Sequence, residues 1–400
     1  MCRYPHLSRS VWVVSLLLIA PPVLLRCSAQ DKKPEAAPDT LVLQNGDTLH
    51  GKLLKEAAGT ITFHTEALGD LTIDWSKIKE LHATEDFAVL SKTAKHRGKR
   101  ASEKLPTGPI DATSESVTVH PAGQQPVAPP IATKDTEYIV DKTTLDKELY
   151  HEPGFFTGWN GSATAGATLV SATQNQYAVS GSVGLVRTVP TVSWLNSRNR
   201  TSTDFSSSYG KITQPAYTGP TGPVAASTTK TSILHFDAER DQYFAPRFFA
   251  LAQTAFDHNF SQDLNLQQIY GGGIGWTAIK TPKQLADLKA TLQYEKQTFI
   301  AGATEANQNL VGTTIAADYS LTMKLFTLSQ SAEFIPAFNN PHAYSAQETD
   351  TVAFPTYKNF GFSVATMDSY LNNPPVTFPP TKRNSFQFTM GVTYAIKSSY

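Results

Sequence analysis

The stretch RNSFQFTMGVTYAIKSSY, residues 383–400, alternates apolar residues with small or polar ones. The apolar residues occupy every second position: Phe386, Phe388, Met390, Val392, Tyr394 and Ile396. A period of two predicts a β-strand, because successive side chains of a strand point to opposite faces. No charged residue interrupts positions 386–396. Neither face of this strand therefore resembles the charged surface of a soluble protein.

Eleven earlier segments show the same kind of alternation, and with the last one they make twelve. They are 158–172, 176–189, 201–213, 229–242, 247–260, 264–278, 285–297, 311–324, 325–338, 344–357 and 358–372. Ordinary strands have about 5–6 residues, whereas most of these have about 12–15, enough to cross a bilayer at a tilt. The pattern therefore predicts long strands in an even number.

Charge is sparse in the part of the chain that holds these segments. Residues 1–150 contain 18 Lys and Arg and 19 Asp and Glu, whereas the remaining 250 contain only 16 and 15. Aromatic residues gather near the predicted strand ends, as interfacial girdles require: Trp159, Tyr177, Tyr243, Phe244, Trp276, Phe299, Phe326, Phe378 and Tyr394. We expect the apolar face to meet lipid and the small polar face to line a lumen. A secreted soluble β-sandwich is the weaker alternative.

Lipid cannot hydrogen-bond to the backbone, so such a sheet has to close, with its last strand against its first. The predicted fold class is all-β: a C-terminal transmembrane antiparallel β-barrel of about 12 strands. We expect a small SH3-like or LSm-like β domain at 39–83, a Pro-rich and basic linker at 84–135 and a short helix at 136–150. The barrel itself is predicted over 154–400.

The first 29 residues have the character of an export signal. Arg3 and Arg9 precede the apolar run VWVVSLLLIA, and a small-residue cleavage site follows at Ala29. Both cysteines of the chain, Cys2 and Cys27, lie before this site. The mature chain is therefore expected to have no disulfide and no cysteine-based metal site or nucleophile.

Eight charged residues fall on the predicted polar face and are candidates for the lumen: Asp237, Glu239, Asp241, Asp287, Lys289, Glu295, Asp318 and Glu333. Their acidic excess predicts a slight cation preference if the lumen is open. Alternatively, bulky inward residues plug the barrel, which then anchors the N-terminal module. His235 and the predicted loop residue His258 show no recognisable catalytic constellation, so we expect no enzymatic activity, cofactor or metal. The zero net charge gives no reason to expect a nucleic-acid partner.

Residues 389–396, TMGVTYAI, resemble the C-terminal recognition signal of bacterial outer-membrane barrels, with Gly391, Tyr394 and Ile396 as its members and Tyr400 in the same phase. Residues 154–400 as a whole resemble the family called domain of unknown function 481, or salt-induced outer membrane proteins. The resemblance is carried by the stretches GWNGSATAGATL, FDAERDQYFAPRFFALAQTAFDHNF, QQIYGGGIGW and NNPPVTFPPTKRNSFQFTMGVTYAI. It implies a porin-like barrel in the outer membrane of a Gram-negative bacterium, and no established activity.

The expected partners follow from this location. The barrel would contact outer-membrane lipids and the barrel assembly machinery. Residues 39–83 would lie in the periplasm and are the candidate segment for binding a cell-wall or periplasmic partner.

Overall fold

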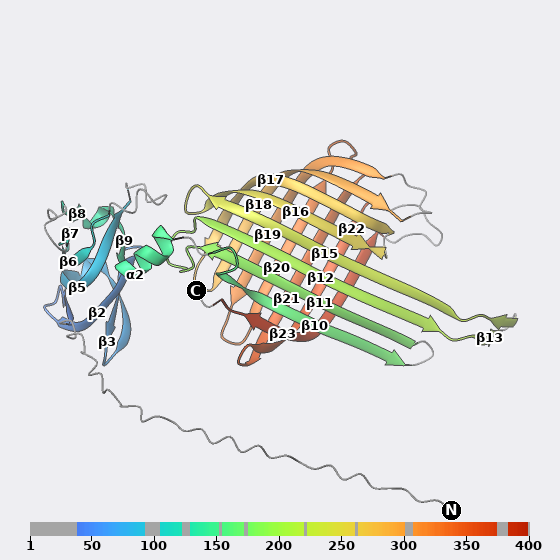
Figure 1. Ribbon diagram of the computed structural model, residues 1–400, viewed down its shortest axis with the longest axis horizontal. Coiled ribbons are helices and arrows are strands. Elements are labelled where there is room, and N and C mark those ends of the chain that lie inside the picture. The colour runs from blue at the N-terminus through green and yellow to red at the C-terminus, as the bar shows by residue number, and fades with distance from the viewer. Residues whose placement is uncertain are drawn as a thin grey trace, which may run out of the picture.

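The computed structural model describes residues 38–92, 105–121, 129–151, 154–171, 175–219, 222–260, 263–300, 307–373 and 383–398. Within these ranges the chain forms a sheet of nine strands in its N-terminal part and a closed barrel in its C-terminal part (Figure 1). No helix among the described residues is long and apolar enough to cross a membrane. The predicted signal peptide at 1–29, the predicted girdle residue Phe378 and the predicted assembly residue Tyr400 lie outside the described residues.

Twelve antiparallel strands close the barrel, which confirms the predicted fold class and strand number. The strands have between 10 and 17 residues. In order around the barrel they are β10 (Trp159–Ser171), β11 (Asn175–Val189), β12 (Asn199–Gln214), β15 (Ser227–Tyr243), β16 (Phe248–Asn259), β17 (Leu264–Lys280), β18 (Gln284–Phe299), β19 (Gln308–Thr322), β20 (Thr327–Pro336), β21 (Tyr344–Tyr357), β22 (Phe360–Leu371) and β23 (Asn384–Ile396).

The last strand closes the barrel against the first, as the sequence pattern predicts. β23 pairs with β10 from Gly161↔Ile396 to Ala165↔Val392. Gly391 allows the two backbones to approach, because a Cβ atom there would lie 2.4 Å from the carbonyl oxygen of Ala165. The closing seam is thus built around a glycine of the predicted assembly signal.

The barrel has two different ends, which we name the turn end and the loop end. Connections at the turn end are 190–198, 244–247, 281–283, 323–326 and 358–359, and those at the loop end include 215–226, 300–307 and 372–383. β10 begins and β23 ends at the turn end, where the Ser398 N–H donates to Asn160 Oδ1 at 3.1 Å. At the loop end, β13 (Tyr217–Gly219) and β14 (Gly222–Val224) extend the β12–β15 hairpin beyond the barrel (Figure 1).

The outer surface of the barrel is apolar, with aromatic residues above and below an aliphatic band. Ile274, Leu292, Ile315 and Val392 are between 56% and 69% exposed. Aromatic pairs flank them at the turn end (Phe248 with Trp276, Phe360 with Tyr394) and at the loop end (Phe256 with Tyr270, Tyr344 with Tyr370). Such a band with two girdles is the surface that an outer-membrane barrel presents to lipid.

Two of the predicted girdle residues point the other way. Tyr243 and Phe299 are only 6% and 8% exposed. They lie two residues from Asp241 and Gln297 on their strands, so the period of two places them on the inner face. Closeness to a strand end therefore does not by itself identify a lipid-facing aromatic residue.

The N-terminal module is a sheet around a small barrel. Its strands are β1 (Asp39–Leu43), β2 (Thr48–Ala57), β3 (Thr60–Thr65), β4 (Gly69–Asp74), β5 (Ile78–Ser91), β6 (Gly108–Thr113), β7 (Ser116–Val119), β8 (Ile131–Ala132) and β9 (Thr136–Asp141). β1, β2, β9 and β5 form a closed ring of four strands, because β9 pairs with both β2 and β5. The assignment of this ring to the SH3-like or LSm-like type stays a prediction.

Part of the region predicted as linker, 84–135, belongs to this module. β5 continues to Ser91, and β6, β7 and β8 add three strands to the sheet. The physical reason is burial: Ile110, Ala112, Val117 and Val119 have at most 2% exposure and complete the core of the module. These apolar residues alternate with polar ones only over short stretches. The basic and Pro-rich runs on either side give the region as a whole the composition of a linker.

The helix predicted at 136–150 is also shorter than expected. Its first six residues form β9, whose Ile139 and Val140 are fully buried. The helical part comprises α2 (Lys142–Thr144) and the π-helical η3 (Leu145–Tyr150). Asp141 starts it as an N-cap, since Asp141 Oδ1 accepts a hydrogen bond from the Thr144 N–H at 2.9 Å.

The module packs against one connection at the turn end of the barrel. Leu195, in the connection 190–198, is 3% exposed and lies in a cluster with Leu90, Leu145 and Leu149 of the module. The buried Glu148 accepts hydrogen bonds from both the N–H and the hydroxyl of Thr191, each at 2.6 Å. The connection between β11 and β12 is therefore an anchor for the module.

Candidate functional site: the barrel lumen

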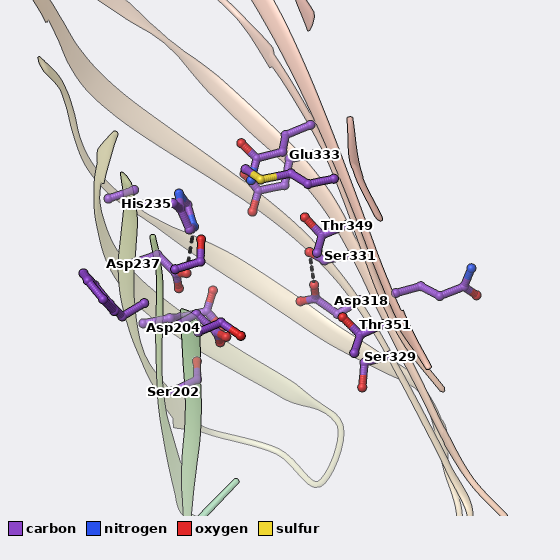
Figure 2. Close-up of a pocket in the computed structure, with 18 of the residues that line it drawn as sticks. Ser202, Asp204, His235, Asp237, Asp318, Ser329, Ser331, Glu333, Thr349 and Thr351 are labelled. Carbon is purple, nitrogen blue, oxygen red and sulfur yellow. Dashed lines mark hydrogen bonds and ion pairs between the residues drawn. The ribbon is translucent and has the colours of Figure 1, made fainter. Parts of the chain in front are cut away.

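The interior of the barrel holds a cavity of about 640 Å³. Its walls differ in character (Figure 2). One wall carries Ser202, Asp204, His235 and Asp237, and across from them lie Asp318, Ser329, Ser331, Glu333, Thr349 and Thr351. Hydroxyl and amide side chains dominate β20–β22, whereas ionisable groups concentrate on β12, β15, β18 and β19.

A first group of buried charges joins strands that are not neighbours. Arg200 of β12 donates from Nε to Asp241 Oδ2 at 2.7 Å and from Nη1 to Asp287 Oδ2 at 2.5 Å. The side chains of Asp241 and Asp287 are 1% and 2% exposed. Their strands, β15 and β18, are separated by β16 and β17, so this guanidinium bridges part of the interior.

A second group repeats the arrangement one layer farther along the strands. Lys289 Nζ lies 2.7 Å from Glu239 Oε2 and 2.7 Å from Asp318 Oδ2. Asp318 also accepts a hydrogen bond from the Ser331 hydroxyl at 2.7 Å. One ammonium thus neutralises two carboxylates on different strands, and Asp318 links the charged wall to the hydroxyl wall.

His235 occupies a third position, between two carboxylates. Its Nδ1 lies 2.5 Å from Asp257 Oδ1 and its Nε2 lies 3.1 Å from Asp237 Oδ1. Asp237 is paired in the β12–β15 ladder with Asp204, so the carboxylates of these two residues share the inner face. An imidazolium ring can donate from both nitrogens, and it is the form of His235 that satisfies both neighbours.

Aromatic side chains narrow the lumen near the turn end. Phe249 is fully buried, and its ring centroid lies 5.0 Å from that of Tyr243. Arg200 extends over the Phe249 ring, with Cζ 5.4 Å from the centroid. Gly275 makes room for the ring, because a Cβ atom there would lie 2.2 Å from it. The sequence YGGGIGW thus permits the close approach of a bulky neighbour, as expected for glycines within a strand.

The structure places all eight predicted lumen residues on the inner face. Asp237, Glu239, Asp287, Lys289, Asp318 and Glu333 line the cavity. Asp241 is buried against Arg200, and Glu295 accepts hydrogen bonds from the Gln267 and Gln297 amides. In residues 235–241, HFDAERD, Glu239 and Asp241 are balanced by Lys289 and Arg200 of other strands. Among the described residues no group of three or more His, Cys, Asp or Glu side chains could hold a metal ion.

Several interior residues were not among the predicted lumen set. Arg200 and Asp204 stand at alternate positions with Ser202 on β12, so strand parity could have assigned them to the inner face. Their partners could not be assigned, because Arg200 and Asp287 are 87 residues apart in the chain. His258, expected in a loop, lies within β16, where its Nδ1 is 2.7 Å from the Asn265 carbonyl oxygen.

A closed twelve-stranded barrel with a lipid-facing apolar belt and a polar interior defines an outer-membrane β-barrel of channel-like architecture. The chain belongs to the family described as "Protein of unknown function, DUF481", whose sequence profile matches residues 163–396. The predicted resemblance and the predicted outer-membrane location are confirmed.

Solved structures similar to this chain include three outer-membrane barrels. The NanC porin is 8% identical over 59% of this chain and 100% of its own, with a TM-score of 0.34. An outer membrane channel from Pseudomonas putida F1 is 12% identical over 62% of this chain and 100% of its own, with a TM-score of 0.34. The translocator domain of the autotransporter NalP from Neisseria meningitidis is 9% identical over 63% of this chain and 92% of its own, with a TM-score of 0.32. No curated protein matches the chain.

Proposed function

We propose that the barrel is a passive channel for small hydrophilic solutes, with a weak preference for cations. The observation that carries this proposal is the charge of the cavity wall. Its acidic residues are Asp204, Asp237, Glu239, Asp287, Asp318 and Glu333, whereas its basic residues are Arg200, His235 and Lys289. An excess of one sign of charge on the wall of a lumen raises the local concentration of the opposite ions.

The hydroxyl wall supports the same proposal. Serine, threonine and glutamine side chains of β20–β22 line the cavity opposite the ionised groups. Short neutral side chains leave space, and their hydroxyl and amide groups can replace the hydration of a passing solute. The arrangement suits small polar solutes better than apolar ones.

A second candidate function is a plugged barrel that anchors the N-terminal module. Phe249 and the Arg200 group favour it, because they fill one side of the interior at the turn end. In this alternative the ionised groups stabilise the barrel, and the module performs the biological role through a periplasmic or cell-wall partner.

Short connections face the periplasm in outer-membrane barrels. We therefore place the turn end and the docked module in the periplasm, and the β13–β14 extension outside the cell. β23, with Gly391, Tyr394 and Ile396, is proposed as the segment that the barrel assembly machinery recognises.

The test is ion conductance of the full mature chain in planar bilayers across a KCl gradient. Discrete steps whose reversal potential has the sign of cation preference would support the channel. The double variant Asp237→Asn/Glu333→Gln should shift the reversal potential toward zero. Asp350→Asn is the matched control, since Asp350 pairs with Gln330 on the outer face of the neighbouring strands.

Two results would count against the channel. A protein that migrates as a folded barrel in gels and inserts in the bilayer, yet conducts no current, would favour the plugged alternative. A reversal potential that moves equally in the lumen variant and in Asp350→Asn would show that the inner carboxylates do not determine selectivity.

A further inference from the structure

A second cavity lies at the junction between the N-terminal module and the barrel, and its volume is also about 640 Å³. Its wall is formed mainly by the module, through residues of β2, η1 (Trp75–Lys77), η2 (Thr133–Asp135) and β9. Trp194 and Asn196 of the barrel connection 190–198 complete it. The two parts of the chain therefore meet at this cavity.

The junction that holds this cavity is well connected. Asn196 Nδ2 donates to Glu137 Oε1 at 3.0 Å, and the rings of Tyr138 and Trp194 lie 6.1 Å apart at an angle of 60°. Lys55 Nζ covers Trp194, 4.7 Å from the ring centroid. These contacts come in addition to the Glu148–Thr191 hydrogen bonds, so the walls of the cavity are held in place.

One group on the wall lacks a hydrogen-bond partner. Glu56 is 2% exposed, and its Oε1 accepts a hydrogen bond from the Gly59 N–H at 3.0 Å. Its Oε2 is buried without a partner in the structure. A buried oxygen without a hydrogen-bond partner is costly to the folded protein. A ligand hydroxyl group in the cavity would supply the missing partner, because a hydroxyl can donate to an ionised carboxyl and accept from a protonated one.

The charges on the wall are balanced. Glu56 and Glu137 contribute carboxyl groups, and Lys92 and Lys134 contribute ammonium groups. Lys92 Nζ is held at the cavity by a hydrogen bond of 2.6 Å to the Lys134 carbonyl oxygen. A strongly charged ligand of either sign would meet groups of its own sign, so the site suits a neutral polar molecule.

Aromatic rings supply the remaining surface. Trp75, Tyr138 and Trp194 line the cavity together with the hydroxyl groups of Ser114, Thr133 and Thr136. Trp75 and Tyr138 are 7% and 9% exposed, so their rings are held by packing. Flat apolar faces beside a few fixed hydrogen-bonding groups are the usual composition of a small-molecule site of about 300–1,000 Å³.

We propose that the junction cavity binds a neutral sugar ring of a glycan. A sugar has flat C–H faces for the aromatic rings, hydroxyl donors for Glu56 Oε2, and no net charge to oppose the balanced wall. A glycan bound there would touch the module and the barrel connection at once and would stabilise their docking. This proposal depends on no property of the lumen, so its test does not depend on whether the barrel is a channel.

The experiment uses the full mature chain in a detergent that contains no sugar. The neutral trimer of N-acetylglucosamine is titrated while tryptophan fluorescence is followed, because Trp75 and Trp194 line the site. The cationic trimer of glucosamine has the same length and serves as the charged comparison. We expect saturable binding of the neutral trimer, at least tenfold tighter than that of the cationic trimer.

Two variants connect the binding to the cavity. Glu56→Gln keeps the shape of the side chain but replaces one acceptor oxygen by a donor, so we expect about tenfold weaker binding, the equivalent of about 1.4 kcal/mol. Glu66→Gln, on an exposed turn of the module, should bind as the parent does. Circular dichroism of each variant confirms that the module is folded.

Three results would overturn the proposal. The first is the absence of a saturable change in fluorescence up to about 10 mM neutral trimer, the concentration range of very weak binding. The second is equal affinity of Glu56→Gln and the parent protein for the neutral trimer. The third is tighter binding of the cationic trimer than of the neutral one. The first result would mean that the cavity holds only water, and the third would mean that it binds amines instead of neutral sugars.

Discussion

Arg200 and Asp287 contact each other inside the barrel, with Nη1 and Oδ2 2.5 Å apart, although three strands lie between β12 and β18. Adjacent strands are about 4.8 Å apart, so the path along the wall is roughly 19 Å. The contact is therefore a chord across the interior rather than a link between neighbours. It narrows the turn end of the lumen and links two parts of the wall that are a third of the barrel circumference apart.

Replacing Arg200 by alanine should both destabilise the barrel and widen the lumen. Without the guanidinium, Asp241 and Asp287 would be buried next to each other with no cation, and breaking such a pair costs about 3–5 kcal/mol. We expect a lower midpoint of urea unfolding in lipid vesicles. If the barrel conducts, we also expect larger single-channel steps.

Arg240→Ala is the matched control, because Arg240 lies on the outer face of β15 and donates to the Thr201 hydroxyl. It should change the unfolding midpoint by far less than Arg200→Ala. Similar losses in the two variants would mean that the interior bridge contributes nothing special to stability.

A side chain at Gly275 should be poorly tolerated. A Cβ atom there would lie 2.2 Å from the Phe249 ring, which is fully buried between β17 and Arg200. We expect Gly275→Ala to lose about 1–3 kcal/mol, the usual cost of overpacking. Thermal unfolding followed by the gel shift between folded and unfolded barrel measures this loss.

Gly272 provides the comparison, since a Cβ atom there would meet only the Leu251 carbonyl oxygen, at 3.4 Å. Gly272→Ala should be nearly neutral. The double variant Phe249→Ala/Gly275→Ala should lose less stability than the sum of the two single losses, because the ring is what the new methyl group strikes. If Phe249→Ala makes the double variant additively worse, the clash is not the cause.

The barrel was accessible to prediction because a period of two is a local signal. Each of the twelve strands can be recognised from its own residues, and parity then assigns residues such as Asp237 and Asp318 to the inner face. The ion pair between Arg200 and Asp287 could not be predicted from the sequence, because it depends on the curvature of the barrel wall between β12 and β18.

The module was predicted less completely for a different reason. β6 and β7 are short, and the strands are flanked by residues of linker composition. Their burial depends on β5, which lies earlier in the chain and pairs with β6, and on Ile139 of β9, which lies later and belongs to the same core. Short strands of this kind are specified by tertiary packing more than by their own sequence.

Glu56 should make the stability of the module depend on pH. Burial raises the pKa of this carboxyl from 4.5 to about 7, and a nearby Lys92 only partly opposes the rise. Between these values the folded module holds a proton that the unfolded chain has released, so stability should fall as pH rises from 4.5 to 7 and then level off. At about 1.4 kcal/mol per pKa unit, the whole change is about 3 kcal/mol.

Glu56→Gln should remove this part of the pH dependence. Chemical unfolding of the full chain, followed by tryptophan fluorescence at several pH values, gives the slope for each protein. The quantity to compare is the difference in slope between the parent and the variant, because that difference belongs to Glu56 alone. A parent slope that survives unchanged in Glu56→Gln would show that the carboxyl titrates normally.

Glu148 should control the docking of the module onto the barrel. Its carboxylate accepts both hydrogen bonds from Thr191, and its backbone carbonyl oxygen accepts one from Arg198 Nη2 at 3.2 Å. Glu148→Ala leaves the Thr191 N–H and hydroxyl without these acceptors, at a cost of about 1–3 kcal/mol. We expect amide hydrogen exchange in the connection 190–198 to become at least about tenfold faster, while exchange in the strands of the barrel stays unchanged.

Glu115→Ala, at an exposed turn of the same module, should leave the exchange rates as they are. Unchanged protection in Glu148→Ala would show that the apolar cluster around Leu195 holds the module by itself.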